Sequence, residues 1–125
     1  MNSKEINVLV LAYLGDTVYE FYIRSYLINK GIRNVKDLQN ESLNYVSAKS
    51  QCRFVEKMLE NNFFTSEEEA VFYRARNYKN NRHPKNCDVM TYKFATGLEA
   101  IIGYLKLESQ EKRIEEIMNQ ITGGF

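Results

Sequence analysis

The near absence of chain breakers constrains the fold of this sequence more than any other feature. Its 125 residues contain one proline, Pro84, and six glycines. No segment sustains the alternation of polar and apolar residues that half-buried β-strands show. Turn signals divide the chain into about six pieces. The sequence therefore predicts an all-α protein, a single domain built as a helical bundle of about six helices.

Local signals indicate where the helices begin and end. We expect helical segments at about 4–29, 34–39, 42–61, 65–76 and 88–105, and a last one from 109 to just before Gly123. Gly31 follows the first segment as a helix-ending glycine. Thr65 and Glu68 have the spacing of a capping box, in which each side chain accepts a hydrogen bond from the backbone N–H of the other residue. Asp88 and Ser109 are the predicted N-caps of the last two helices.

Cysteine use and the N-terminal sequence favour an intracellular protein. Cys52 and Cys87 form neither a ligand cluster nor a disulfide framework, which is typical of a reducing compartment. The N-terminal residues have the character of neither a signal peptide nor a transit peptide. Charged residues interrupt the longest apolar stretch, from Ile6 to Ile28, so we do not expect it to span a membrane. The expected setting is the cytoplasm.

Basic residues gather in one segment of the chain. The sequence has 17 Lys and Arg against 16 Asp and Glu, yet residues 74–87 include no acid. Five basic residues lie there: Arg74, Arg76, Lys79, Arg82 and Lys85. The net charge of +1 therefore combines a cationic segment with a mildly acidic remainder. Residues 77–87 are predicted to form a loop, which could follow a phosphate backbone or be an ordinary solvated loop.

Two carboxylates lie in strongly apolar helical sequence. Asp16 occurs in LVLAYLGDTVYEFYI and Glu99 in FATGLEAIIGYL. Burial of an unpaired carboxylate is costly, so each is expected to have a cation, hydrogen-bond donors or a metal nearby. Two packed helices could bring these side chains face to face, and Mg²⁺ between them would offset their repulsion. Salt bridges, such as one from Glu20 to Arg24 along a helix, are the alternative explanation.

Three glycines fall in the helical pattern beside these acids. Gly15 precedes Asp16, and Gly97 and Gly103 flank Glu99. Glycine inside a helix costs about 1 kcal/mol relative to alanine, so its presence there calls for a physical reason. Close approach of two helices around the carboxylates would supply that reason, and helix crossing without any chemistry is the alternative.

Together these segments resemble the ribonuclease III family. The stretch LAYLGDTV at 11–18 is similar to the signature helix of that family, and ATGLEAIIG at 95–103 is similar to its second acidic helix. The likeness is strongest to the short branch called Mini-ribonuclease III, and it includes YVSAK at 45–49 and PKNCDV at 84–89. That branch consists of the catalytic domain alone. The resemblance therefore implies one catalytic domain over residues 1–125, without a double-stranded-RNA-binding domain.

Two of the family's four metal-site carboxylate positions hold other residues in this chain. The four positions map onto Ala12, Asp16, Thr96 and Glu99. Because the short branch is similar in this respect, the resemblance implies that Asp16 and Glu99 are both the catalytic residues and the ligands of Mg²⁺, for which Mn²⁺ can substitute. Ala12 and Thr96 leave the number of metal ions per site open. Glu20 is either an outer helper of the site or a salt-bridge residue.

The resemblance implies a metal-dependent endoribonuclease that hydrolyses double-stranded RNA to 5′-phosphate and 3′-hydroxyl ends, in the maturation of large-subunit (23S) ribosomal RNA. It also implies a homodimer in which each protomer cuts one strand. Aromatic residues of the first segment are expected either at the dimer surface or in the monomer core: Tyr19, Phe21, Tyr22 and Tyr26. The expected RNA-binding residues are Arg74, Arg76, Lys79, Lys85 and Lys49. A non-catalytic helical RNA-binding module and a helical protein-interaction domain are the alternatives.

Overall fold

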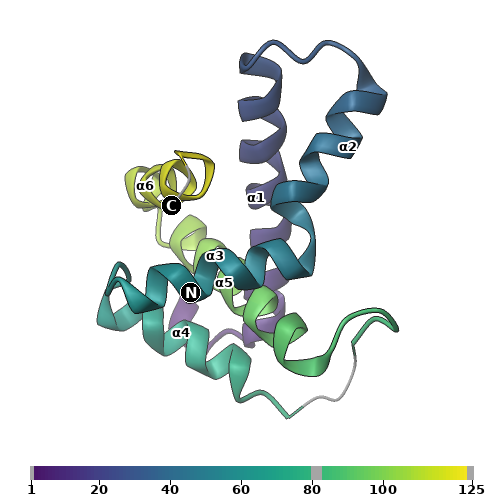
Figure 1. Ribbon diagram of the computed structural model, residues 1–125. Helices are drawn as coiled ribbons and strands as arrows, with labels where there is room; N and C mark the ends of the chain where they lie inside the picture. The colour runs from purple at the N-terminus through teal and green to yellow at the C-terminus, as the bar shows by residue number, and fades with distance from the viewer. Residues whose placement is uncertain (1, 80–82, 124–125) are drawn as a thin grey trace.

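The computed structural model describes residues 2–79 and 83–123, and in this part of the chain all regular structure is helical (Figure 1). A short 3₁₀-helix precedes six α-helices. The elements are η1 (Ser3–Glu5), α1 (Val8–Asn29), α2 (Val35–Val46), α3 (Ala48–Glu60), α4 (Ser66–Arg76), α5 (Val89–Leu107) and α6 (Glu111–Gly123). The predicted all-α bundle of about six helices is confirmed.

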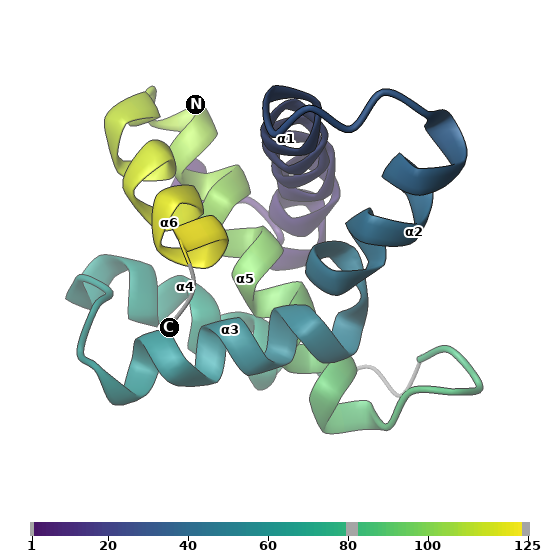
Figure 2. The same ribbon diagram turned by 45° about the horizontal axis from the view of Figure 1, so that its top comes forward.

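Helix α5 is the central element of the bundle. Helices α1, α3, α4 and α6 all pack against it, as the view in Figure 2 shows. Between Ala95 and Leu105, every residue of α5 except Glu99 is buried. The largest fully buried side chains around it come from the four surrounding helices: Leu11, Tyr19, Ile23, Leu27, Met58, Phe72, Ile114, Ile117 and Ile121. Removal of this apolar surface from water is the main driving force that assembles the bundle.

Helix α2 lies at the edge of the molecule. It contacts α1 and α3, and none of its residues is buried. In both ribbon views it stands beside α1, to which the turn at Gly31 joins it (Figures 1 and 2). Within the described residues, no helix combines the length and the apolar character that a membrane span requires.

The predicted caps at Thr65 and Asp88 are present. The Thr65 hydroxyl accepts a hydrogen bond of 3.1 Å from the Glu68 backbone N–H, and the Glu68 carboxylate accepts one of 2.9 Å from the Thr65 N–H. The Asp88 carboxylate accepts a hydrogen bond of 2.9 Å from the N–H of Thr91. These caps satisfy backbone donors that have no partner inside the helix.

Three predicted helix boundaries are wrong, each for a local reason. The first long helix begins at Val8 instead of near residue 4, because the side chain of Asn7 caps it. The break between the two helices of residues 34–61 lies at Ser47 and not near residue 40. Ser47 has extended backbone geometry and caps α3. Ser109 is no cap: its φ of 57° lies in the left-handed region, and α6 begins at Glu111.

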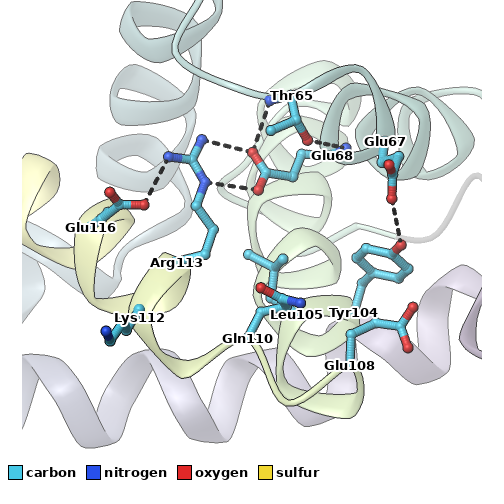
Figure 3. Close-up of a pocket in the computed structure, with 10 residues that line it drawn as sticks. All are labelled: Thr65, Glu67, Glu68, Tyr104, Leu105, Glu108, Gln110, Lys112, Arg113 and Glu116. Atoms are coloured by element: carbon cyan, nitrogen blue, oxygen red, sulfur yellow. Dashed lines mark hydrogen bonds and ion pairs between the residues drawn. The ribbon is translucent and has the colours of Figure 1, made fainter.

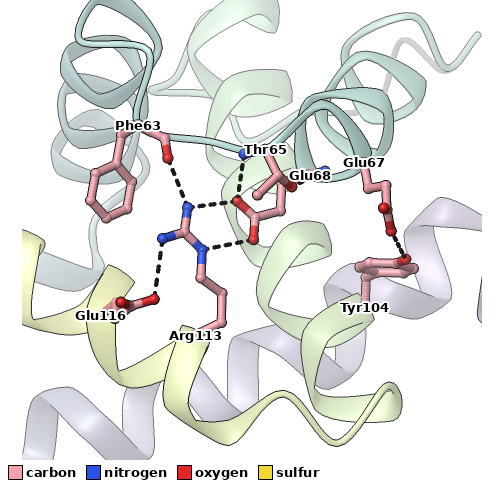
Figure 4. Close-up of polar contacts among 7 residues, drawn as sticks. All are labelled: Phe63, Thr65, Glu67, Glu68, Tyr104, Arg113 and Glu116. Carbon is pink, nitrogen blue, oxygen red and sulfur yellow. Dashed lines mark hydrogen bonds and ion pairs between the residues drawn. The ribbon is translucent and has the colours of Figure 1, made fainter.

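A buried ion pair ties α6 to the start of α4 (Figure 4). Two nitrogens of the Arg113 guanidinium donate hydrogen bonds of 2.8 Å to the two carboxylate oxygens of Glu68, whose residue is only 2% exposed. The same guanidinium donates at 2.8 Å to the backbone oxygen of Phe63. An open polar cavity of about 450 Å³ adjoins this pair (Figure 3). Neither Asp16 nor Glu99 lines that cavity, so it is separate from the carboxylates of interest.

Candidate active site

Two glycines allow α1 and α5 to touch backbone to backbone. A Cβ atom on Gly15 would lie 1.7 Å from the backbone oxygen of Glu99, and one on Gly103 would lie 1.9 Å from the backbone oxygen of Leu11. No side chain fits at either position, because the obstructing atoms belong to the opposite helix backbone. The predicted reason for these two glycines, close helix approach beside the carboxylates, is confirmed.

The crossing brings the side chains of Asp16 on α1 and Glu99 on α5 together. The pKa of the Glu99 carboxyl is raised to about 9, first by burial, then by a hydrogen bond with Asp16 and by the negative charge of that residue. Two carboxyl groups this close cannot both ionise without strong repulsion. Glu99 therefore keeps its proton near neutral pH unless a cation lies beside it.

Asp16 is exposed, contrary to the burial expected from its apolar sequence. Its neighbours Tyr13 and Thr17 are exposed as well, while the apolar side of α1, with Leu11 and Tyr19, faces the core. A surface position keeps one carboxylate hydrated and accessible. Glu99 is half-buried behind it, so only one of the two acids bears a substantial desolvation cost.

Gln51 on α3 is a third polar side chain at this site, and it belongs to none of the motifs that predicted the site. Its amide nitrogen lies 3.5 Å from the Oε2 atom of Glu99, and its residue is 3% exposed. A sequence signal was available, because Gln51 falls on the same helix face as the buried Phe54, Val55 and Met58. A polar residue in an apolar stripe indicates a specific hydrogen-bonding role.

The two positions that carry carboxylates in the wider family contribute no ligand here. Ala12 is buried, and the Thr96 hydroxyl donates a hydrogen bond of 2.9 Å to the backbone oxygen of Tyr92, within its own helix. Gly97, next to Thr96, does not serve the crossing of α1 and α5: a Cβ there would lie 2.5 Å from the ring of Phe72. The expectation that all three helical glycines surround the carboxylates is therefore wrong for Gly97.

Of the two roles that the sequence allowed for Glu20, the structure shows the salt bridge. Its carboxylate accepts a hydrogen bond of 2.9 Å from Arg24, one helical turn later; the Arg24 side chain is exposed and that of Glu20 is partly buried. Its negative charge also contributes, as the weakest of the causes, to the raised pKa of Glu99. Glu20 thus lies near the pair but is already partnered by a cation.

The donor set at the crossing fits a hard divalent cation. Among residues 2–79 and 83–123, no group of three or more His, Cys, Asp or Glu side chains is placed to hold a metal ion. Two carboxylates, one exposed and one half-buried, are nevertheless the donors with which proteins commonly bind Mg²⁺, which keeps several waters and takes further oxygens from phosphate. Asp16 and Glu99 are the residues that could hold such a cation.

The predicted RNA-binding residues lie in different settings. Arg74 and Arg76 belong to α4 and not to the loop. Arg74 is half-buried and donates a hydrogen bond of 2.5 Å to the backbone oxygen of Ile6, so part of its donor set already fastens the N-terminal segment. Arg76 lies over the ring of Tyr73, 4.5 Å from its centre.

The lysines of the predicted set are exposed: Lys49, Lys79 and Lys85. Lys49 is in the first turn of α3, while Lys79 and Lys85 lie on either side of residues 80–82. Arg82, the remaining basic residue of the cationic segment, lies outside the described residues. The ammonium groups of the three lysines are therefore available to a phosphate, whereas one nitrogen of the Arg74 guanidinium is already bound to Ile6.

The aromatic residues of α1 divide between core and surface. Tyr19 belongs to the core, and its hydroxyl donates a hydrogen bond of 2.6 Å to the backbone oxygen of Tyr45. Of the two positions expected for Tyr19, dimer surface or monomer core, the structure shows the monomer core. Tyr22 and Tyr26 are half-buried, and Phe21 is 66% exposed. Phe21 shares its helix face with other exposed apolar residues: Val10, Tyr13 and Ile28.

Comparison with known proteins gives consistent similarities. The profile of the Ribonuclease III domain matches residues 9–110. A protein named Mini-ribonuclease 3 from Enterococcus faecalis is 45% identical over 116 residues, which cover 93% of this chain and 88% of that protein. One of the same name from Clostridium tetani is 41% identical over 98% of this chain and 80% of its own length. The X-ray structure of a Fusobacterium nucleatum protein superposes with a TM-score of 0.89 at 35% identity, covering 99% of this chain and 100% of that one.

Proposed function

This protein is a ribonuclease that belongs to the ribonuclease III family, in the group named Mini-ribonuclease 3, and we propose that it cuts double-stranded RNA. The observation that carries this proposal is the crossing at Gly15 and Gly103, which brings Asp16 and Glu99 face to face. Such an arrangement opposes folding in the absence of a cation, and it is the arrangement that a cation-dependent hydrolase needs.

The reaction we propose is hydrolysis of a phosphodiester bond to 5′-phosphate and 3′-hydroxyl ends. Asp16 and Glu99 would hold Mg²⁺, or Mn²⁺ as a substitute. The bound cation would supply polarisation of a phosphate oxygen and a lower pKa for the attacking water. Glu99 has to release its proton to act as a ligand, because burial and Asp16 favour its protonated form in the metal-free protein. The rigid helix crossing fixes the separation of the two carboxylates before substrate arrives.

The substrate would be held by basic residues that the catalytic domain itself provides. We assign Lys49, Lys79 and Lys85 to phosphate contacts because their ammonium groups are exposed. Arg76 joins them at the end of α4. Arg74 would contribute only the donors that Ile6 leaves free. Duplex RNA is recognised mainly by its shape and its phosphates, so we expect little sequence preference from these contacts.

A homodimer fits the exposed apolar face of α1. The four residues Val10, Tyr13, Phe21 and Ile28 line one side of this helix, and Tyr13 is 82% exposed. An apolar stripe along a 22-residue helix is costly to leave in water and is typical of an interface. A two-fold dimer through this face would match the pseudo-symmetry of an RNA duplex and would place one carboxylate pair near each strand.

We further propose that the protein acts in the cytoplasm on precursors of large-subunit (23S) ribosomal RNA, and that residues 1–125 form a ribonuclease III catalytic domain. The family membership and the substrate class support this assignment. It would be tested by sequencing the ends of ribosomal RNA precursors from cells depleted of the protein, in which unprocessed 23S ends should accumulate.

The catalytic proposal is tested by incubating the purified protein with long double-stranded RNA and Mg²⁺. Asp16→Asn and Glu99→Gln should each abolish cleavage while duplex binding is retained. Glu60→Gln, which alters an exposed carboxylate at the far end of α3, is the matched control and should cut at the wild-type rate. If the wild-type protein binds duplex RNA but does not cut it, whichever divalent cation is supplied, the alternative of a non-catalytic RNA-binding module is correct.

The RNA contacts are tested separately from catalysis. Arg76→Ala and Lys85→Ala should weaken duplex binding and reduce its dependence on salt, while the thermal stability stays close to that of the wild type. Lys112→Ala changes an exposed lysine on α6 and serves as the charge-matched control. A large loss of stability in Arg76→Ala or Lys85→Ala would show that these residues are structural instead.

A further inference from the structure

Gln51 is a buried polar residue held firmly in place beside the carboxylate pair. Its backbone N–H donates a hydrogen bond of 2.9 Å to the oxygen of Ser47, in the first turn of α3. The neighbouring turns of the same helix face are anchored in the core by Phe54, Val55 and Met58. Its side chain therefore approaches Glu99 from a fixed base.

The side chain of Gln51 contacts the carboxyl group of Glu99. The amide nitrogen lies 3.5 Å from the Oε2 atom, which is long for a hydrogen bond. Contacts of this kind are often long in an unliganded site and become shorter when the ligand binds. Since Gln51 lies on α3, whereas Asp16 and Glu99 lie on α1 and α5, three helices meet at the pair.

An amide donor suits a carboxylate that has to bind a cation. Arg or Lys at this position would also donate to Glu99, but its positive charge would repel a divalent ion. The neutral amide can orient one carboxylate oxygen and leave the rest of the carboxyl group for the ion. Donors that orient ligating carboxylates in this way commonly change metal affinity 10- to 100-fold when they are removed.

We propose that Gln51 is a positioning residue, which holds the Glu99 carboxylate in the orientation that binds a divalent cation. This inference rests on the proposed function, because it assumes that Asp16 and Glu99 bind such an ion. It assigns to α3 a direct part in the site, in addition to its packing against α5.

The test measures metal binding apart from catalysis. Gln51→Met keeps the length of the side chain and removes the donor, and Gln51→Leu is a second apolar variant in case the first does not fold. Binding of Mn²⁺ without RNA is measured by isothermal titration calorimetry, and the Mg²⁺ concentration that gives half-maximal cleavage is measured in parallel. We expect roughly 10-fold weaker Mn²⁺ binding and a matching increase in the Mg²⁺ requirement. Cleavage at saturating Mg²⁺ should recover most of the wild-type rate.

Ser50→Ala is the matched control. Ser50 is the adjacent buried polar residue, but its hydroxyl bonds to Ser47 and to the backbone oxygen of Leu43, not to Glu99. This variant should lose some stability and keep wild-type Mn²⁺ affinity. The positioning role is overturned if Gln51→Met binds Mn²⁺ as tightly as the wild type, or if Ser50→Ala weakens binding to the same extent. If the wild-type protein itself neither binds Mn²⁺ nor cuts duplex RNA, the proposed function fails instead.

Discussion

Replacement of Arg113 by methionine should cost the protein a large part of its stability. The guanidinium donates two 2.8 Å hydrogen bonds to the carboxylate of Glu68 and one to Phe63. Without them, the buried Glu68 carboxylate would keep only its 2.9 Å hydrogen bond from Thr65. Breaking a buried pair from one side costs about 3–5 kcal/mol, because an uncompensated charge remains in the interior. For a domain of this size, that loss lowers Tm by about 10–20 °C.

The measurement is urea denaturation followed by far-UV circular dichroism, with Lys106→Met as the matched control. Lys106 forms an ion pair of 2.6 Å with Glu111, but the two side chains are 44% and 48% exposed. Water and salt screen such a pair, so its loss should cost less than about 1 kcal/mol. The double variant Glu68→Leu/Arg113→Met, which leaves no buried charge, should regain stability relative to Arg113→Met. Equal small losses for Arg113→Met and Lys106→Met would refute this reasoning.

Three further predictions concern the helix crossing, the carboxylate pair and the proposed dimer. Gly15→Ala should destabilise the protein by about 3 kcal/mol or more and abolish cleavage, because its Cβ would collide with backbone; Gly123→Ala, which meets no atom within 4 Å, should be neutral in the same denaturation assay. With EDTA present, the free energy of unfolding should fall as the pH rises from about 5 to 9. Burial and Asp16 raise the pKa of Glu99 to about 9 in the folded protein. Over this pH range the folded protein therefore keeps a proton on Glu99 that the unfolded chain has already lost. Glu99→Gln should remove this decline. A free energy of unfolding that does not change with pH in the wild type would contradict the raised pKa of Glu99. Phe21→Glu should weaken dimerisation about 10-fold or more in light scattering, and a wild-type monomer at high concentration would exclude the proposed interface.

Features that depend on neighbouring residues could be predicted from the sequence. The capping box at Thr65 and Glu68 requires only a three-residue spacing, and it is present. Paired glycines next to acids correctly indicated a close helix crossing, because backbone contact is one of the few reasons for glycine inside a helix. The break at Ser47 was missed since serine within a helix and serine as a cap look alike until the backbone turns.

Features that depend on tertiary contacts could not be predicted in the same way. Arg74 was selected for its charge, yet the structure gives it the backbone oxygen of Ile6, a partner 68 residues away. Asp16 shares its helix face with the buried residues Ala12, Tyr19 and Ile23, yet it is exposed. Helical spacing alone predicts burial there, and only the packing of the neighbouring helices leaves this position open to solvent. Gln51 could have been found, because a glutamine among buried apolar residues of one helix face requires a polar partner.

The backbone contact between Gly15 and Gly103 has a consequence for the order of events during folding. Its two halves come from the first and the last thirds of the chain, so the ribosome must synthesise most of the protein before they can meet. Contacts of high sequence separation form late, after local helices have been established. A nascent or partly folded chain would therefore hold Asp16 and Glu99 apart and be unable to cut RNA. Nuclease activity would begin only on completion of the native fold, when the crossing of α1 and α5 has formed.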